Sequence, residues 1–233
     1  MFIFKVINMQ SNTRNFRNGV GRFHEFALIY GIMIGDGCIS RSGKKYFISI
    51  CGNIKDDPMF FERVIIPKLS KIRGKEIRYR RREKYGKIEI NFSDKSLFTK
   101  FRTYGFPVGH KRNISIPRKF LMNKVFIKKV IAGIFATDGS IPLVRNNGIL
   151  YPRLEFRSIS RKLLKQIQVV LFEAGMKGGL YKKFYRLQYN GIKQLLLFKK
   201  RIGFVNPKHS ERVSQFLKMN ARGGYRTLGL QIS

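Results

Sequence analysis

Acidic residues are scarce in this sequence of 233 residues, which contains 13 Asp and Glu against 48 Lys and Arg. The formal charge of +35 calls for a polyanionic partner. Nucleic acid is the usual one, because each phosphate contact releases counterions and affinity grows with every cation laid along the backbone. A membrane surface is the alternative.

Long apolar runs are also missing. Segments 27–35 and 130–137 are about half as long as the roughly 20 residues that a membrane-spanning helix requires. The apolar segment 1–7 is interrupted at Lys5 and is too short for a signal-peptide core. We therefore expect a protein that has no membrane partner, is not secreted, and acts inside the cell, in the cytoplasm, the nucleoid or an organelle matrix.

Cysteine is rare, since only Cys38 and Cys51 occur and they form no CxxC pattern. We expect both to be free thiols, buried or half-buried, in a reducing compartment. With 43% hydrophobic residues and no low-complexity tract, the chain should fold as an ordinary globular protein.

The sequence does contain an internal repeat. The segments LIYGIMIGDG (28–37) and VIAGIFATDG (130–139) lie 102 positions apart and align Gly31 with Gly133 and Asp36 with Asp138. The agreement continues in GFPVGHK (105–111) and GFVNPK (203–208). Two halves of similar design are implied, and the predicted organisation is a basic arm over 1–22, a first half over 23–110, a linker over 111–121 and a second half with a basic tail over 122–233.

The hydrophobic periodicity predicts an α+β fold in which each half runs helix, two strands, helix, two strands, helix, with antiparallel sheets. In the first half we expect helices near 24–35 and 57–72, a strand near 45–51, a hairpin over 77–92 with its turn at 83–86, and a short helix capped by Asp94. In the second half we expect a helix to about 136, strands near 150–158, a helix from Ser160 to Gly175, a hairpin-like segment over 180–189, and helices near 192–201 and 209–219.

Each repeated segment pairs a glycine with a second small residue one helical turn later, Gly31 with Gly35 and Gly133 with Thr137. Two buried core helices would explain the apolar residues around them. They would not explain this spacing, which clears a groove where a second backbone can approach closely. We therefore expect the two helices to pack against each other.

If these helices pack side by side in parallel, Asp36 and Asp138 emerge together at their C-terminal ends. The helix dipole disfavours a carboxylate there, and two charges about 4 Å apart add a repulsion of roughly 4 kcal/mol at an effective dielectric of about 20. A hard divalent cation would offset this cost, with Mg²⁺ as the physiological candidate and DNA phosphate oxygens as its remaining ligands. Gly35 and Thr137, the preceding residues, are included in the expected metal site.

Segments 29–37 and 131–139 resemble the two LAGLIDADG motifs of homing endonucleases, and the layout is similar to the single-chain members from about residue 22 to 220. The resemblance implies two pseudo-symmetric αββαββα halves that meet along the motif helices, with two sheets forming a saddle over DNA. It implies that Asp36 and Asp138 bind metal. The penultimate motif position, commonly acidic in the family, holds Ile34 and Ala136 here.

The resemblance further implies a monomeric enzyme that cuts both strands of a long DNA target across the minor groove and leaves short 3′ overhangs. The target need not be palindromic, because the two halves differ in sequence. Mg²⁺ is the expected cofactor, Mn²⁺ is expected to substitute for it, and Ca²⁺ is expected to bind without cleavage.

Members of the family tend to place one lysine near the metals in each half, and Lys111 and Lys208 match those positions. Such a lysine would stabilise developing negative charge at the phosphate, although a lysine in ordinary contact with solvent is the alternative for each. Asn53 resembles the family's water-ordering polar residue, and Ser158 is its approximate counterpart.

The predicted hairpins carry the expected DNA readers. Strand alternation projects Arg78, Arg80 and Arg82 from one face, and it places Lys182, Arg186 and Gln188 together on another. Arg suits guanine edges and Gln suits adenine in the major groove. The basic segments 14–22 and 222–226 are expected to meet phosphates or to be disordered without DNA.

Two alternatives use the same surface: an intron RNA maturase and a non-catalytic DNA-binding protein on the same fold. The two intact motif aspartates favour a nuclease over a non-catalytic protein, while a bifunctional protein would keep both, which leaves intron RNA open as a second partner. An intein is not expected, because the sequence starts Met-Phe and ends Gln-Ile-Ser. A basic ribosomal-type protein would account for the charge and not for the repeat.

Overall fold

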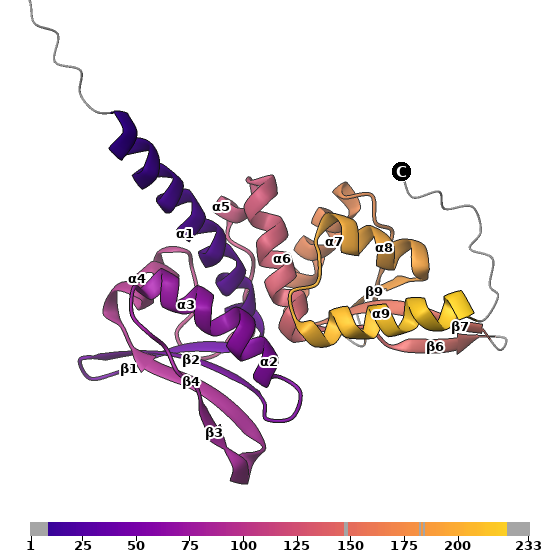
Figure 1. Ribbon diagram of the computed structural model, residues 1–233, viewed down its shortest axis with the longest axis horizontal. Helices are drawn as coiled ribbons and strands as arrows, with labels where there is room; N and C mark the ends of the chain where they lie inside the picture. The colour runs from indigo at the N-terminus through magenta and orange to yellow at the C-terminus, as the bar shows by residue number, and fades with distance from the viewer. Residues whose placement is uncertain (1–8, 147–148, 182, 184, 223–233) are drawn as a thin grey trace, which may run out of the picture.

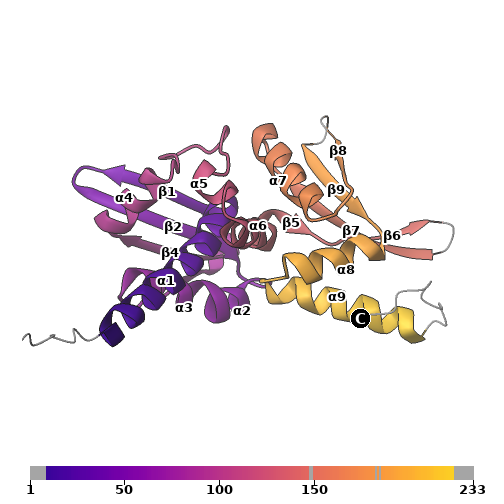
Figure 2. The same ribbon diagram turned by 90° about the horizontal axis from the view of Figure 1, so that it is seen from above.

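The computed structural model describes residues 9–222, apart from 147, 148, 182 and 184 (Figure 1). Two α+β halves lie on either side of a central pair of helices, α1 (Met9–Asp36) and α6 (Lys124–Asp138) (Figures 1 and 2). Within the described part of the chain, no helix is both long and apolar enough to cross a membrane. Because α1 begins at Met9, the basic segment 14–22 is a part of this helix.

The first half has the predicted order of elements. After α1 come β1 (Gly37–Ser42) and β2 (Lys45–Asn53), a helical segment made of α2 (Pro58–Phe60), a π-helical turn (Phe61–Ile65) and α3 (Ile66–Arg73), then β3 (Arg80–Arg82), β4 (Lys87–Ser93) and α4 (Lys95–Thr103). The turn between β3 and β4 is a single 3₁₀ turn, Glu83–Tyr85. Asp94 caps α4 as expected, accepting a hydrogen bond from the Leu97 N–H at 2.9 Å.

The second half repeats this order. A short helix, α5 (Arg118–Leu121), precedes α6, and then follow β5 (Gly139–Ser140), β6 (Leu143–Asn146), β7 (Ile149–Arg157), α7 (Arg161–Glu173), β8 (Gly179–Tyr181), β9 (Arg186–Asn190), α8 (Ile192–Arg201) and α9 (Pro207–Arg222). Ser160 caps α7 through the Leu163 N–H, as predicted.

Both sheets are antiparallel and have the same strand order, β1-β2-β4-β3 in the first half and β5-β7-β9-β8 in the second, with β6 pairing to β7. The predicted fold class, two similar αββαββα halves, is therefore confirmed. Side chains alternate along each strand, so that Ile48 and Ile50 of β2 are buried in the core while Ser49 and Cys51 point to the opposite face. We call this second face, in each sheet, the open face.

Two details differ from the sequence expectation. The first strand of each half begins immediately after the motif, at Gly37 and at Gly139, where only short and weakly alternating segments are present. The strand expected over 77–82 is limited to Arg80–Arg82, so Arg78 lies outside it, exposed and paired with Glu76 at 3.0 Å. Arg78 therefore does not share the sheet face with Arg80 and Arg82.

Candidate active site

The two motif helices cross with their backbones in contact. A Cβ atom added to Gly31 would lie 2.1 Å from the carbonyl oxygen of Val130, and one added to Gly133 would lie 2.3 Å from that of Leu28. These distances are too short for any side chain, so only glycine fits at either position. The close packing predicted from the small residues is confirmed.

The close approach continues to the C-terminal ends of the helices. A Cβ atom on Gly35 would lie 2.0 Å from the Thr137 hydroxyl oxygen and 3.2 Å from the Asp138 carboxyl carbon. The Thr137 hydroxyl donates back to the Ile134 carbonyl at 3.0 Å. Asp36 and Asp138 are the last residues of α1 and α6, so each half delivers one carboxylate to the same place.

The pKa values of both carboxyl groups reflect this crowding. Burial raises the pKa of Asp138 to about 7, and the charge of Asp36 adds to the shift while Lys111 opposes it. Burial also raises the pKa of Asp36 to about 6, with a contribution from Asp57 in the same direction and opposition from Lys111 and Lys208. Asp36 keeps one side exposed to solvent. Both carboxylates are therefore held in a place where a cation is favoured.

Lys111 lies at the end of α1, as the resemblance implies, and its ammonium group is engaged there. Its Nζ donates hydrogen bonds to the carbonyl oxygens of Met33 at 3.2 Å, Ile34 at 2.9 Å and Gly35. Burial lowers the pKa of Lys111, and the charges of Asp138 and Asp36 oppose this shift. Lys111 thus neutralises the negative end of the α1 dipole beside the two carboxylates.

The equivalent contact in the second half is made by Asn206. This buried side chain donates from Nδ2 to the carbonyl oxygen of Ala136 at 2.9 Å, and Ala136 aligns with Ile34 in the repeat. Lys208, which the sequence paired with Lys111, has a different neighbour. The two lysines are therefore not structural equivalents.

Lys208 instead joins the two halves. Its Nζ lies 2.8 Å from Oδ1 of Asp57, a buried residue of the first half that precedes α2. The Oδ2 atom of Asp57 accepts a hydrogen bond from the Asn53 N–H at 2.8 Å. Both Lys208 and Asp57 act electrostatically on Asp36, so the ion pair borders the candidate active site.

Asp57 and Asn206 are site residues that the sequence analysis did not single out. Each could have been found only by knowing which loop meets the end of a motif helix in three dimensions. Asn53 was singled out, but its side-chain oxygen accepts hydrogen bonds from the N–H groups of Lys55 at 2.8 Å and Asp56 at 3.2 Å, which shapes the turn before α2. Ser158 lines a hollow beside Asp138, together with Lys111 and Tyr185.

The open faces of the two sheets carry most of the other expected site residues. On β3, Arg80 lies opposite Glu89 of β4 and Arg82 lies opposite Lys87, and Arg82 forms an ion pair with Glu89 at 3.5 Å. In the second sheet Arg186 and Gln188 share the open face of β9, where both contact Glu155, and Gln188 is buried. Lys182 and the tail beyond residue 222 lie outside the described residues.

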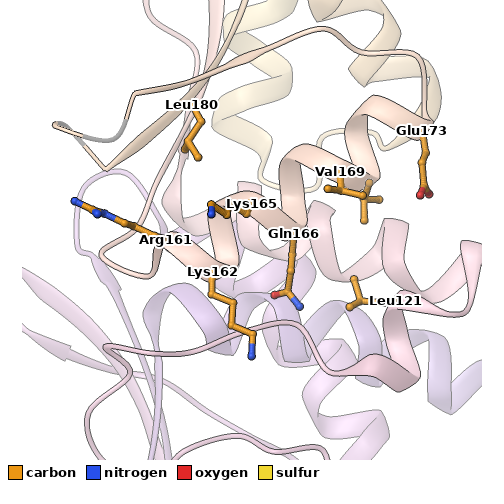
Figure 3. A pocket seen from close by; sticks show the side chains of 9 residues that line it. Leu121, Arg161, Lys162, Lys165, Gln166, Val169, Glu173 and Leu180 are labelled. Atoms are coloured by element: carbon orange, nitrogen blue, oxygen red, sulfur yellow. The ribbon is translucent and has the colours of Figure 1, made fainter.

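A separate hollow over α7 lies apart from the two carboxylates (Figure 3). It is lined by Lys162 and Lys165, by apolar side chains such as Leu121 and Val169, and by Gln166. Gln166 forms two hydrogen bonds with the backbone of Ile116, one through each amide atom, at 2.8 and 3.0 Å. This region therefore attaches the segment between the halves to α7.

The two halves, joined along glycine-packed helices that each end in an aspartate, define a two-domain LAGLIDADG fold. Residues 126–203 match the family model described as a LAGLIDADG-like domain. The match lies within the second half of the chain, and the first half repeats the architecture of that segment. No curated protein matches the chain in sequence.

Solved structures of homing endonucleases are similar to both halves of the chain in fold. The chain matches a structure of mesophilic variants of the homing endonuclease I-DmoI at 15% identity, with a TM-score of 0.56 over 80% of this chain and 93% of the other. It matches I-DmoI in complex with DNA and Mn at 16% identity, with a TM-score of 0.56 over 78% and 97%. The I-LtrWI LAGLIDADG homing endonuclease bound to target DNA matches at 9% identity, with a TM-score of 0.54 over 86% and 91%. At these identities the likeness establishes the fold.

Proposed function

We propose that this chain is a site-specific DNA endonuclease that makes a metal-dependent double-strand break with short 3′ overhangs in a long, non-palindromic target. The observation that carries the proposal is the delivery of one carboxylate from each half to the ends of two packed helices, beside Lys111 and Lys208. A non-catalytic DNA-binding protein would have no need for both carboxylates.

The carboxylates fit a divalent cation with oxygen ligands. Burial and mutual repulsion raise both pKa values, and a bound cation would reverse that penalty. Among the described residues, no cluster of three or more His, Cys, Asp or Glu side chains could hold a metal alone. Asp36 and Asp138 would therefore share the cation with DNA phosphate oxygens and water, and the cation would supply an activated water and charge stabilisation at the phosphate.

Comparison with solved structures supports this choice of cofactor. I-DmoI has been solved in complex with DNA and Mn and in complex with DNA and Ca. For the present chain we propose Mg²⁺ as the working ion, with Mn²⁺ able to replace it. The chain would act as a monomer, because it already contains both halves.

The remaining charged groups would position the DNA. The charge of Lys111 acts on both carboxylates and that of Lys208 acts on Asp36, so positive charge near the pair would favour a phosphate there. The open faces of the sheets extend away from the pair in both halves and carry basic side chains such as Arg80 and Arg157. An antiparallel sheet surface with these side chains fits the major groove on either side of the cleaved step.

The decisive experiment uses genomic DNA that lacks the insertion encoding the chain, incubated with the protein and Mg²⁺. We expect breaks at one or a few sites, with 3′ overhangs when the ends are sequenced. The variant Asp36→Asn, Asp138→Asn should bind DNA and leave it intact. Equal cleavage by both proteins, or none by the wild type, would refute the proposal.

A further inference from the structure

A buried carboxylate lies on the open face of the second sheet. Glu155 is a residue of β7, between the core residues Leu154 and Phe156, so its side chain points away from the core. It is nevertheless only 2% exposed. Across the sheet it lies opposite Ser140 of β5 and Gln188 of β9.

The side chains that cover Glu155 are almost all cationic. Its Oε1 lies 3.6 Å from Arg153 and 3.6 Å from Arg186, and its Oε2 lies 3.3 Å from Arg157. Gln188 donates from Nε2 to Oε1 at 2.7 Å. One carboxylate thus contacts three guanidinium groups and one amide.

The arginines are fixed at further points. The Nε atom of Arg153 donates to the side-chain oxygen of Asn190 at 2.9 Å, and the guanidinium of Arg186 lies over the Tyr181 ring, 5.9 Å from its centre. Glu155 and the three arginines line a hollow, and Arg212 of α9 lines it as well. Arg157 also borders the hollow that contains Asp138, so the group begins next to the active site.

A carboxylate is an unexpected residue on a surface that receives phosphates. It repels the DNA backbone, and burying it is costly unless it is fully paired. Its effect on the arginines explains its presence. A guanidinium held along one edge keeps the N–H groups of its other edge in a fixed direction, which suits the paired acceptors of a guanine edge. Gln188 is itself buried, so its amide fixes the carboxylate and leaves the contact with bases to the arginines.

The first sheet has a smaller group at a different place, where Glu89 of β4 lies 3.5 Å from Arg82 and 3.8 Å from Lys87. The register of the sheets aligns Ile50 with Phe156, because these residues lie opposite Gly37 and Gly139. By the same register Ser49 corresponds to Glu155, Cys51 to Arg157 and Phe47 to Arg153. The residues at the positions of Glu155, Arg157 and Arg153 are therefore uncharged in the first sheet.

We propose that Glu155, fixed by Gln188, is a positioning residue that sets the base-pair preference of the DNA bound by the second sheet, by holding Arg153, Arg157 and Arg186 as one preformed reading unit. This inference rests on the proposed function, since it requires specific binding of duplex DNA. It predicts two effects of removing the charge of Glu155. The arginine side chains become less fixed in orientation, and the repulsion between this sheet and DNA phosphates decreases.

The test is a selection of bound duplexes from a randomised library in Ca²⁺, carried out with the wild type, Glu155→Gln and a charge-matched control, Glu76→Gln. Glu76 is exposed in the first half and pairs only with Arg78 among its described contacts. For Glu155→Gln we expect discrimination to fall about tenfold or more at positions on one side of the target. Affinity for random DNA should stay the same or rise, and the control should select the wild-type sequence.

Two outcomes would overturn the inference: unchanged preference in Glu155→Gln, or an equal loss on both sides of the target. Thermal melts followed by circular dichroism establish whether the variant is folded. If it is not, Arg153→Gln and Arg157→Gln replace it, and they must affect the same side of the target for the inference to stand. Absence of any selected sequence with the wild type would instead refute the proposed function.

Discussion

At the scale of the residue, the C-terminal ends of α1 and α6 bring two carboxyl groups and two lysine side chains close together. Two carboxylates with raised pKa values lie beside a lysine that is bound to three helix carbonyls and a second lysine that is bound to Asp57. The two lysines are thus placed by different partners, and their replacement should have different consequences.

Replacing Lys111 should cost more stability than replacing Lys208. In Lys111→Met the carbonyls at the end of α1 lose a buried charged donor, so the free energy of unfolding should fall by about 2–3 kcal/mol. In Lys208→Met a partly exposed ion pair is lost and Asp57 keeps its backbone hydrogen bond, so the loss should be about 1 kcal/mol or less. Urea denaturation of the two variants measures the difference, and equal losses would contradict it.

In the metal-free protein Asp36 and Asp138 should contribute a loss of stability as the pH rises from about 4 to about 7. Burial lowers the pKa of His209 to about 4, which acts in the opposite direction, so the effect is measured against Asp138→Asn, which shares this histidine. Both carboxyl groups have pKa values raised above 3.8 in the folded chain, so the folded state binds more protons than the unfolded state in this range. Deprotonation therefore favours unfolding.

Melting temperatures at pH 4.5 and 7.5, with and without Mg²⁺, check this expectation. Without metal, the melting temperature of the wild type should fall more between pH 4.5 and pH 7.5 than that of Asp138→Asn. Addition of Mg²⁺ at pH 7.5 should raise the melting temperature of the wild type and not that of the variant. A wild type that loses no more stability than Asp138→Asn over this range would show that the carboxylates are not protonated as expected.

At the scale of the element, the contact between α1 and α6 depends on two glycines and their carbonyl neighbours. No side chain separates the backbones at Gly31 and Gly133. The same helix α1 contains another glycine, Gly21, whose Cβ position is open. The chain therefore provides its own control for the effect of an added methyl group.

Gly31→Ala should destabilise the protein, whereas Gly21→Ala should not. The methyl group on Gly31 would overlap the Val130 carbonyl, and separating the helices should cost about 1–3 kcal/mol or more. On Gly21 the methyl group meets no atom, and higher helix propensity should add up to about 1 kcal/mol. Thermal unfolding of the two variants compares them. Equal effects would mean that the helices can move apart freely.

Much of the element order could be predicted, because long periodic segments such as those of α3, α7 and α8 identify helices. The helix packing could also be predicted, since Gly31 and Gly133 recur at matched positions. The short strand β5 could not, because two residues carry no period. Asp57 and Asn206 could not be predicted, because their roles depend on contacts between loops that are distant in the sequence. Gln188 was expected at the surface, because the alternation of a strand does not reveal a buried partner such as Glu155.

At the scale of the whole molecule, the charge of +35 and the two open sheet faces should make DNA affinity strongly dependent on salt. If 6–10 phosphates are contacted, affinity should fall by about 10³–10⁵ between 50 and 200 mM salt. Fluorescence anisotropy with a labelled duplex gives the slope of affinity against salt concentration. A DNA affinity that does not change with salt concentration would argue against a protein surface that contacts the DNA phosphates.

The glycine crossing has a consequence for how such molecules can diversify. At the centre of this interface the two helices contact each other through backbone atoms. The partner helix therefore needs a small residue at the crossing point, and few of its other side chains are constrained there. A half taken from another protein of this architecture should therefore dock against α1 with little adjustment, provided that it retains its own glycine. Recombination of halves would then yield new target sites without redesign of the joint between them.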